Sequence, residues 1–224
     1  VQDTAGHEWE VENISLPARM DGYPEQVPFD VNGTYYRVHT ILVADHPNLY
    51  PAGTYTIIFD GTGEIALTGD AGDTTLTGAN IPHELTVDPT IMGIQMTIIQ
   101  SDQSDPIHNI RFIMPGHSET YEIQPFYPLA LERLANFQLV RFMKPLDVEE
   151  TAIESWTQRT PKNFSTQWNV DGGGMAPDYV TELSNALNTD AWINIPYAAD
   201  DNFVRQFAAH LNDSLNSDLK VYIE

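Results

Sequence analysis

The sequence predicts two domains of different fold class, a β-sandwich or jelly roll over residues 1–105 and a domain of alternating strands and helices over 106–224. In the first part, short runs rich in Thr, Ile, Val and Tyr are interrupted by Gly, Asp, Asn and Pro about every 8–12 residues. In the second part, strand-like apolar runs alternate with segments whose apolar residues recur at helical spacing. With 224 residues, 42% of them hydrophobic, the chain can bury two cores.

The first domain is predicted from six strands. In TYTIIFD (54–60) and GIQMTII (93–99) the alternation of side chains places one face of each strand in a core. Residues 1–29 are polar and spaced by prolines, which predicts an irregular arm over the sandwich. The expected strands are 35–44, 53–61, 63–69, 73–78, 83–87 and 93–101.

The second domain is predicted from four strands and three helices. Pro128 and Pro177 suit the first turn of a helix, and the strands are apolar nearly throughout, as in a parallel sheet buried on both faces. The pattern fits a small doubly wound sheet or the first half of a (β/α)8 barrel, and the lack of G-x-G-x-x-G after the first strand disfavours dinucleotide binding. The strands are expected at 108–114, 138–143, 191–197 and 220–224, and the helices at 124–137, 176–188 and 200–215.

Composition disfavours several classes of partner. Acidic residues outnumber basic ones 32 to 10, a formal charge of −22, which repels nucleic-acid phosphates and anionic lipid. The chain has no cysteine, which excludes disulfides and thiolate metal sites. It has no run of about 18 apolar residues, so we expect no membrane insertion. A neutral ligand or a cation suits this surface better.

Three stretches of the second domain carry a resemblance to a known family: LVRFM (139–143), INIPYAADD (193–201) and KVYIE (220–224). They resemble the second, third and fourth strands of a (β/α)8 glycoside hydrolase of the large retaining clan. PAGTYTIIFDGTGEIALTG (51–69) resembles the accessory sandwich of secreted polysaccharide-degrading proteins. The resemblance implies a partial (β/α)8 barrel of about four βα units at 106–224, secretion, and action on an extracellular polysaccharide.

The resemblance also implies roles for three residues. Arg141 matches the arginine that ends the second strand and supports a catalytic carboxylate, and Glu224 is the catalytic candidate at the end of the fourth strand. Ile223 stands where the family has an asparagine before the glutamate, and Tyr197 stands where a histidine is more usual. Both departures weaken the match, although Tyr197 stays a substrate-binding candidate.

The family takes its two catalytic carboxylates from strands four and seven, and retaining hydrolysis needs both, about 5–5.5 Å apart. We therefore expect this chain to be a piece of a longer protein and to be inactive alone. The alternative is a non-catalytic carbohydrate-binding or structural extracellular assembly protein, which could self-associate through exposed strand edges.

The long loop after the second strand supplies further substrate-binding candidates, Trp156, Arg159 and Trp168. Tryptophan faces can stack on sugars and arginine can bind hydroxyl groups, but the tryptophans could instead pin the loop to the domain. Asp200 could bind a sugar hydroxyl or cap the next helix.

Acidic residues cluster around glycine turns in FDGTGEIALTGDAGD (59–73), namely Asp60, Asp70 and Asp73 with Glu64. Ca²⁺ takes several oxygen ligands, so these residues form a weak calcium candidate. Turn chemistry alone also favours Asp beside Gly, and we expect no other metal or cofactor.

Overall fold

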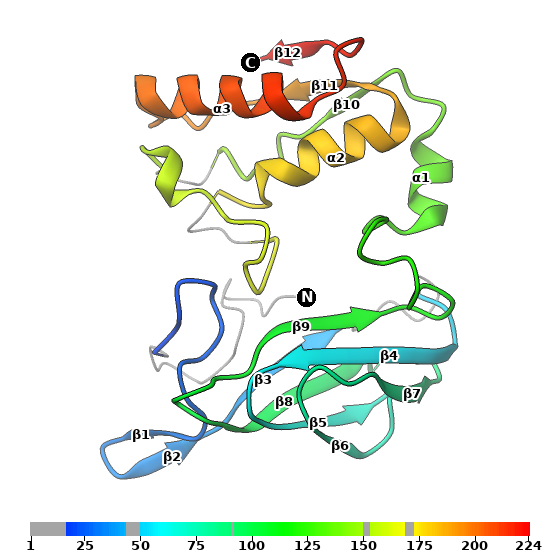
Figure 1. Ribbon diagram of the computed structural model, residues 1–224, viewed down its shortest axis with the longest axis vertical. Helices are drawn as coiled ribbons and strands as arrows, with labels where there is room; N and C mark the ends of the chain where they lie inside the picture. The colour runs from blue at the N-terminus through cyan, green and yellow to red at the C-terminus, as the bar shows by residue number, and fades with distance from the viewer. Residues whose placement is uncertain (1–16, 44–49, 91, 150–152, 169–172) are drawn as a thin grey trace. The chain divides into compact units, whose positions relative to one another are not determined.

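The computed structural model describes residues 17–43, 50–90, 92–149, 153–168 and 173–224 (Figure 1). Within these ranges the protein is mostly β-sheet, with twelve strands in four sheets and three α-helices. The chain divides into two compact units. Unit 1 comprises Val1–Ile123 with Asn163–Ser165, and unit 2 comprises Gln124–Lys162 with Thr166–Glu224.

Unit 1 is built from antiparallel strands (Figure 1). A short hairpin pairs β1 (Phe29–Val31) with β2 (Thr34–Tyr36). The four-stranded sheet has the order β3 (Val38–Leu42), β8 (Ile94–Ser101), β5 (Gly63–Gly69), β6 (Thr74–Thr77). The three-stranded sheet has the order β7 (His83–Val87), β4 (Gly53–Asp60), β9 (His108–Ile113).

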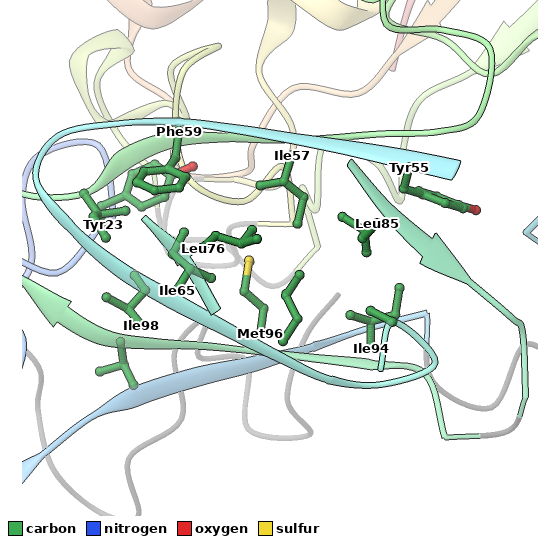
Figure 2. Packing of buried hydrophobic residues seen from close by; sticks show 14 of the residues in the cluster. Tyr23, Tyr55, Ile57, Phe59, Ile65, Leu76, Leu85, Ile94, Met96 and Ile98 are labelled. Carbon is green, nitrogen blue, oxygen red and sulfur yellow. The ribbon is translucent and has the colours of Figure 1, made fainter. Parts of the chain in front are cut away.

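The four-stranded and the three-stranded sheets of unit 1 both contribute side chains to one hydrophobic cluster (Figure 2). On β5, Ile65 and Leu67 are buried and the residue between them is not, because successive side chains of a strand point to opposite faces. Each fully buried aliphatic or aromatic side chain contributes roughly 1.5–3 kcal/mol relative to an exposed one. The arrangement is consistent with the β-sandwich that the sequence predicts. Buried members from β4, β5 and β8 are Tyr55, Ile57, Phe59, Ile65, Leu67, Ile94, Met96 and Ile98.

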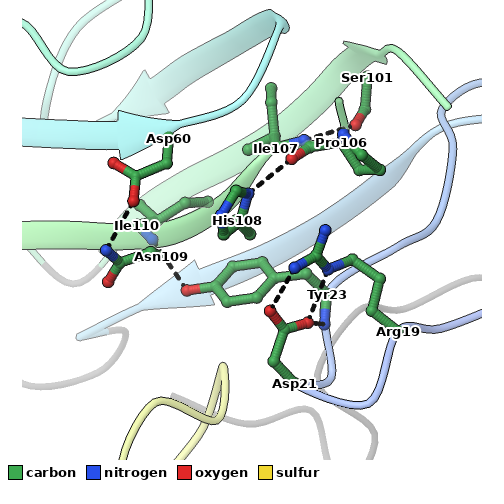
Figure 3. A network of polar contacts seen from close by, with 10 residues as sticks. All are labelled: Arg19, Asp21, Tyr23, Asp60, Ser101, Pro106, Ile107, His108, Asn109 and Ile110. Carbon is green, nitrogen blue, oxygen red and sulfur yellow. Dashed lines mark hydrogen bonds and ion pairs between the residues drawn. The ribbon is translucent and has the colours of Figure 1, made fainter. Parts of the chain in front are cut away.

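The segment before β1 packs against the strands of unit 1 (Figure 3). Tyr23 is 5% exposed, and its hydroxyl accepts a hydrogen bond from the Ile110 backbone N–H at 2.9 Å. Arg19 donates to both carboxylate oxygens of Asp21, at 2.9 and 2.8 Å. Backbone bonds also join Val27 and Ser101 in both directions. One buried aromatic ring and several backbone bonds therefore fix residues 19–27 to the sheet.

Unit 2 contains a parallel sheet of three strands in the order β10 (Leu139–Arg141), β11 (Asp190–Ile193), β12 (Val221–Ile223). Its helices are α1 (Pro128–Leu134), α2 (Pro177–Leu187) and α3 (Asp201–Ser214), and a 3₁₀ turn, η1, spans Trp156–Gln158. None of the described helices has the length and apolarity needed to cross a membrane.

Helices α2 and α3 bury their apolar sides against one face of this sheet (Figure 1). Pro177 occupies the first turn of α2, where its missing N–H costs nothing, and Asn188 ends the helix in the left-handed conformation. On α3, Phe203, Phe207 and Leu211 recur at helical spacing and are all buried. The core they share with the sheet also contains Phe142, Val180, Ala191 and Ile193.

The prediction of a partial (β/α)8 barrel is wrong. Among the described residues no barrel closes, and the parallel sheet has three strands rather than about four βα units. The expected first barrel strand, 108–114, is β9, which pairs antiparallel with β4 in unit 1. Its sequence explains the error, because HNIRFI alternates rather than being apolar throughout. Ile110 and Phe112 pack against the core of unit 1, while Arg111 pairs with Asp60.

Candidate functional site

The carboxyl ends of the three parallel strands bring together polar and aromatic side chains. Arg141 pairs with Trp192 across β10 and β11, and Trp192 pairs with Tyr222 across β11 and β12. The Glu224 N–H donates to the Ile193 carbonyl at 3.0 Å, and the Ile195 N–H donates to the Glu224 carbonyl at 3.1 Å. These two bonds place Glu224 directly beside Asn194, one step beyond the paired strands.

The side chains at this end lie on the face of the sheet that α2 and α3 do not cover. Ala191 and Ile193 point into the helix-covered core, so the alternation of side chains directs Trp192 to the other face. That face is open to solvent, with Leu139 37% and Tyr222 48% exposed. Asn194 follows the end of β11 and is buried, at 7% exposure. We define the carboxyl-end site as Arg141, Trp192, Asn194 and Glu224.

An ion pair lies at the centre of the carboxyl-end site. Arg141 Nη2 donates to Glu224 Oε2 at 2.5 Å, and the guanidinium carbon lies 4.8 Å from the centroid of the Trp192 ring. The two charged side chains are 40% and 51% exposed. Solvent screening makes such a pair a minor contributor to the stability of the fold. The pair does, however, hold a hydrogen-bond donor and an acceptor side by side at the surface, where a ligand could bind them.

Hydrogen bonding keeps the Glu224 carboxylate ionised. The bond from Arg141 lowers the pKa of Glu224 most, and bonds from the Asn194 and Trp192 side chains lower this pKa further. A carboxyl group with a lowered pKa is an acceptor at neutral pH and a poor proton donor. The geometry therefore suits hydrogen-bond acceptance, and a role of Glu224 as a catalytic acid stays a prediction.

The three substrate-binding candidates of the long loop differ in role from this ion pair. Trp156 packs in the interior of unit 2, with ring centroids 5.4 Å from Phe203 and 5.5 Å from Phe207. Arg159 places its guanidinium carbon 4.4 Å from the centroid of the Trp156 ring. Trp168 is 42% exposed. The first two side chains thus anchor the loop to α3, which leaves Trp168 as the loop tryptophan that a ligand could reach.

The two candidates after β11 differ in their surroundings. Asp200 is the N-cap of α3, and its Oδ1 accepts a hydrogen bond from the Phe203 N–H at 2.6 Å. Capping explains this aspartate without a ligand. Tyr197 is 76% exposed, so its ring is available to a partner in solution.

The calcium candidates have other partners in the structure. Asp60 binds Arg111 and Asn109, and Asp70 is buried and hydrogen-bonded, while Asp73 is exposed. In the part of the chain that the structure describes, no group of three or more His, Cys, Asp or Glu side chains could hold a metal ion. Calcium binding stays an untested prediction.

The sequence analysis missed Trp192 and Asn194. Both lie in AWINIP, which reads as one apolar run and so predicts a strand buried on both faces. The signal that could have identified Trp192 is the alternation within that run, because Ala191 and Ile193 form one face of the strand and Trp192 the other. Asn194 stands out as an amide within an apolar run, and a buried amide requires hydrogen-bond partners.

Comparisons with known proteins add no relatives. No family model matches the chain, and neither the curated proteins nor the solved structures contain a match. The functional argument therefore depends on the carboxyl-end site itself.

Proposed function

We propose that the chain binds a neutral extracellular polysaccharide through the carboxyl-end site. The observation that carries the proposal is the exposed Arg141–Glu224 pair beside the Trp192 ring. Sugar hydroxyl groups both donate and accept hydrogen bonds, and this pair offers both functions side by side, across the end of the central strand β11. The guanidinium has five N–H donors, and one of its nitrogens donates to Glu224. The Glu224 carboxylate has about four acceptor positions, so both groups can form further hydrogen bonds with a ligand.

The location of the site supports binding. In open α/β sheets, ligands bind outside the carboxyl ends of the strands, where loops and side chains of several strands converge. Arg141, Asn194 and Glu224 come from three successive strands at that end. Their separation in sequence, from 141 to 224, means that the site exists only in the folded unit.

The charge of the site favours a neutral ligand over an acidic one. Glu224 neutralises Arg141, so the site has no surplus positive charge to attract a uronate or a sulfate. The formal charge of −22 on the whole chain adds a long-range repulsion of polyanions. Uncharged chains of hexose or pentose units meet neither penalty.

Hydrolysis of the polysaccharide is the second candidate function. It is favoured by an ionised carboxylate held by an arginine, because a glycosidase nucleophile requires that state. A second carboxylate at about 5–10 Å is also required, whereas the partners that hold Glu224 are a guanidinium, an amide and an indole. Binding without hydrolysis therefore fits the carboxyl-end site better.

Affinity electrophoresis in gels that contain soluble neutral polysaccharides tests the proposal. We expect at least one of a panel of β-glucans, xylans, mannans and galactans to retard the protein, and Arg141→Met to abolish the retardation. Tyr35→Ala, at an exposed position of unit 1, is the matched control and should be retarded like the wild type. Binding confined to alginate or a sulfated galactan, or no retardation by any polysaccharide, would contradict the proposal. Release of reducing ends would support hydrolysis.

A further inference from the structure

A small cavity lies inside unit 2, behind the carboxyl-end site. Its volume is about 20 Å³, and its walls include Ile153, Arg159, Met175, Asn194 and Phe207. One water molecule needs a cavity of about 10–15 Å³. The cavity is therefore large enough for a water molecule and too small for a sugar.

Two buried polar atoms of the cavity residues have unused hydrogen-bonding capacity. Arg159 Nε and Asn194 Oδ1 are both inaccessible to solvent and have no hydrogen-bond partner among the described residues. The first is a donor and the second an acceptor. Buried polar atoms are nearly always satisfied by protein or by ordered water, so these two atoms call for a bridging group that can both accept and donate.

Both side chains also have neighbours that fix their positions. Arg159 Nη1 donates to the Trp156 carbonyl at 3.0 Å, and its guanidinium covers the Trp156 ring. Asn194 lies directly beside Glu224 in the sheet, and its amide lowers the pKa of the Glu224 carboxyl group. An amide lowers a carboxyl pKa by directing its N–H groups toward the carboxylate, which leaves the oxygen Oδ1 for a partner in the cavity.

We propose that one water molecule binds in this cavity, accepts a hydrogen bond from Arg159 Nε and donates one to Asn194 Oδ1. Through this water, Arg159 is a positioning residue of the carboxyl-end site. It holds the Asn194 amide in the orientation that directs its N–H groups to Glu224. Arg159 thus acts from the interior rather than by touching a ligand. Its importance for ligand binding rests on the proposed function, but the water and the orientation of the amide do not.

An atomic-resolution crystal structure of the full chain and NMR of the Glu224 carboxyl group test the proposal. We expect density for one water within hydrogen-bonding distance of both atoms. In Arg159→Met, which keeps an apolar stem against Trp156 but removes the donors, we expect the pKa of Glu224 to rise. Glu224→Gln assigns the carboxyl signal. Arg205→Met removes a basic side chain from the exposed surface of α3 and should leave this pKa unchanged.

A purely structural arginine would lower stability in Arg159→Met without moving the pKa of Glu224, and that result overturns the proposal. A dry cavity also overturns it. If Arg159→Met does not fold, the wild type still gives a decisive measurement, a nuclear Overhauser effect between the Arg159 Nε–H proton and a long-lived water. Its absence overturns the proposal. None of these measurements uses a polysaccharide, so failure of the proposed function would be seen separately, as lack of retardation in the gels.

Discussion

Asp70 in unit 1 and Glu224 in unit 2 are two carboxylates with lowered pKa values in opposite settings. Asp70 follows β5 and is 7% exposed, and its oxygens accept from the Tyr50 hydroxyl, from the Thr90 hydroxyl and N–H, and from the Gly93 N–H. Burial raises the pKa of Asp70, but these hydrogen bonds outweigh burial and lower it overall. Glu224 is exposed and is held chiefly by Arg141.

The contrast shows that a lowered pKa does not by itself identify a binding site. All the donors of Asp70 belong to its own unit. They come from two segments of the chain, at residue 50 and at residues 90 and 93, so the carboxylate joins these segments to the end of β5. The Glu224 side chain is 51% exposed, so its carboxylate keeps acceptor positions open to solvent. Both residues were candidate site residues in the sequence. Their exposure and the origin of their hydrogen-bond donors distinguish a structural role of Asp70 from a surface role of Glu224.

Among the substitutions that test this contrast, we expect the largest effect on stability from Asp70→Ala. The substitution leaves the buried Tyr50 hydroxyl and Gly93 N–H, and the partly buried Thr90 N–H, without an acceptor. It should lower the free energy of unfolding of unit 1 by about 3 kcal/mol. Hydrogen exchange measured by mass spectrometry should show faster exchange in β5 and β8. Asp73→Ala removes an exposed carboxylate three residues away and should leave exchange unchanged. Equal effects of the two variants would contradict a structural role of Asp70.

The same carboxylate predicts how the stability of unit 1 depends on pH. Because the pKa of Asp70 is lower in the folded state than its ordinary value of 3.8, its contribution is complete above that value and is lost as the pH falls through the folded-state pKa. The urea midpoint of the wild type should therefore drop more steeply below about pH 4 than that of Asp70→Asn. Parallel curves for the two proteins would show that the carboxylate does not stabilise the fold.

The corresponding change in unit 2 should affect binding and not stability. Glu224→Gln keeps the shape of the side chain but removes the charge that Arg141 holds, so we expect polysaccharide binding to weaken about tenfold, the loss of one charged hydrogen bond. The urea midpoint should stay that of the wild type, since exposed ion pairs add little. Asp218→Asn removes a charge from an exposed position near β12 and is the matched control. A lowered midpoint in Glu224→Gln would remove the distinction between the two carboxylates.

Much of the local structure could be predicted from the sequence, because it depends on neighbouring residues. The alternation in residues 54–60 and 93–99 identified β4 and β8, and prolines and an acidic first turn marked α2 and α3. The pairing of β9 could not be predicted in this way. A short apolar run does not by itself specify the strand with which it pairs. The partner of β9 lies far away in the chain, and Asp60 at the end of β4 binds Asn109 and Arg111 of β9 across 49 and 51 residues.

The candidate site was predicted only in part. Arg141 and Glu224 were selected through the resemblance to a glycoside-hydrolase clan, which places each at the end of a strand, and the structure pairs them at 2.5 Å. Trp156 and Arg159 were substrate-binding candidates, with pinning of the loop by the tryptophans as the alternative. The sequence contains no sign that α3 supplies Phe203 and Phe207 to pack against Trp156. Burial of a loop residue depends on the distant element that covers it, so sequence spacing alone could not reveal it.

The smallest effect that we expect concerns the hydroxyl of Tyr50. Burial and the hydrogen bond to Asp70 raise the pKa of Tyr50 to about 12, so one tyrosine should ionise well after the exposed ones in an alkaline titration followed by ultraviolet absorption. Tyr50→Phe should remove that late transition and lower the free energy of unfolding by about 1 kcal/mol, because Asp70 keeps its bonds to Thr90 and Gly93. Tyr35→Phe, at a position 71% exposed, is the control and should change neither quantity. If Tyr50→Phe destabilised unit 1 as much as Asp70→Ala, the stabilising effect of the Asp70 carboxylate would depend on this one donor. The contrast with Glu224, which is held chiefly by Arg141, would then fail.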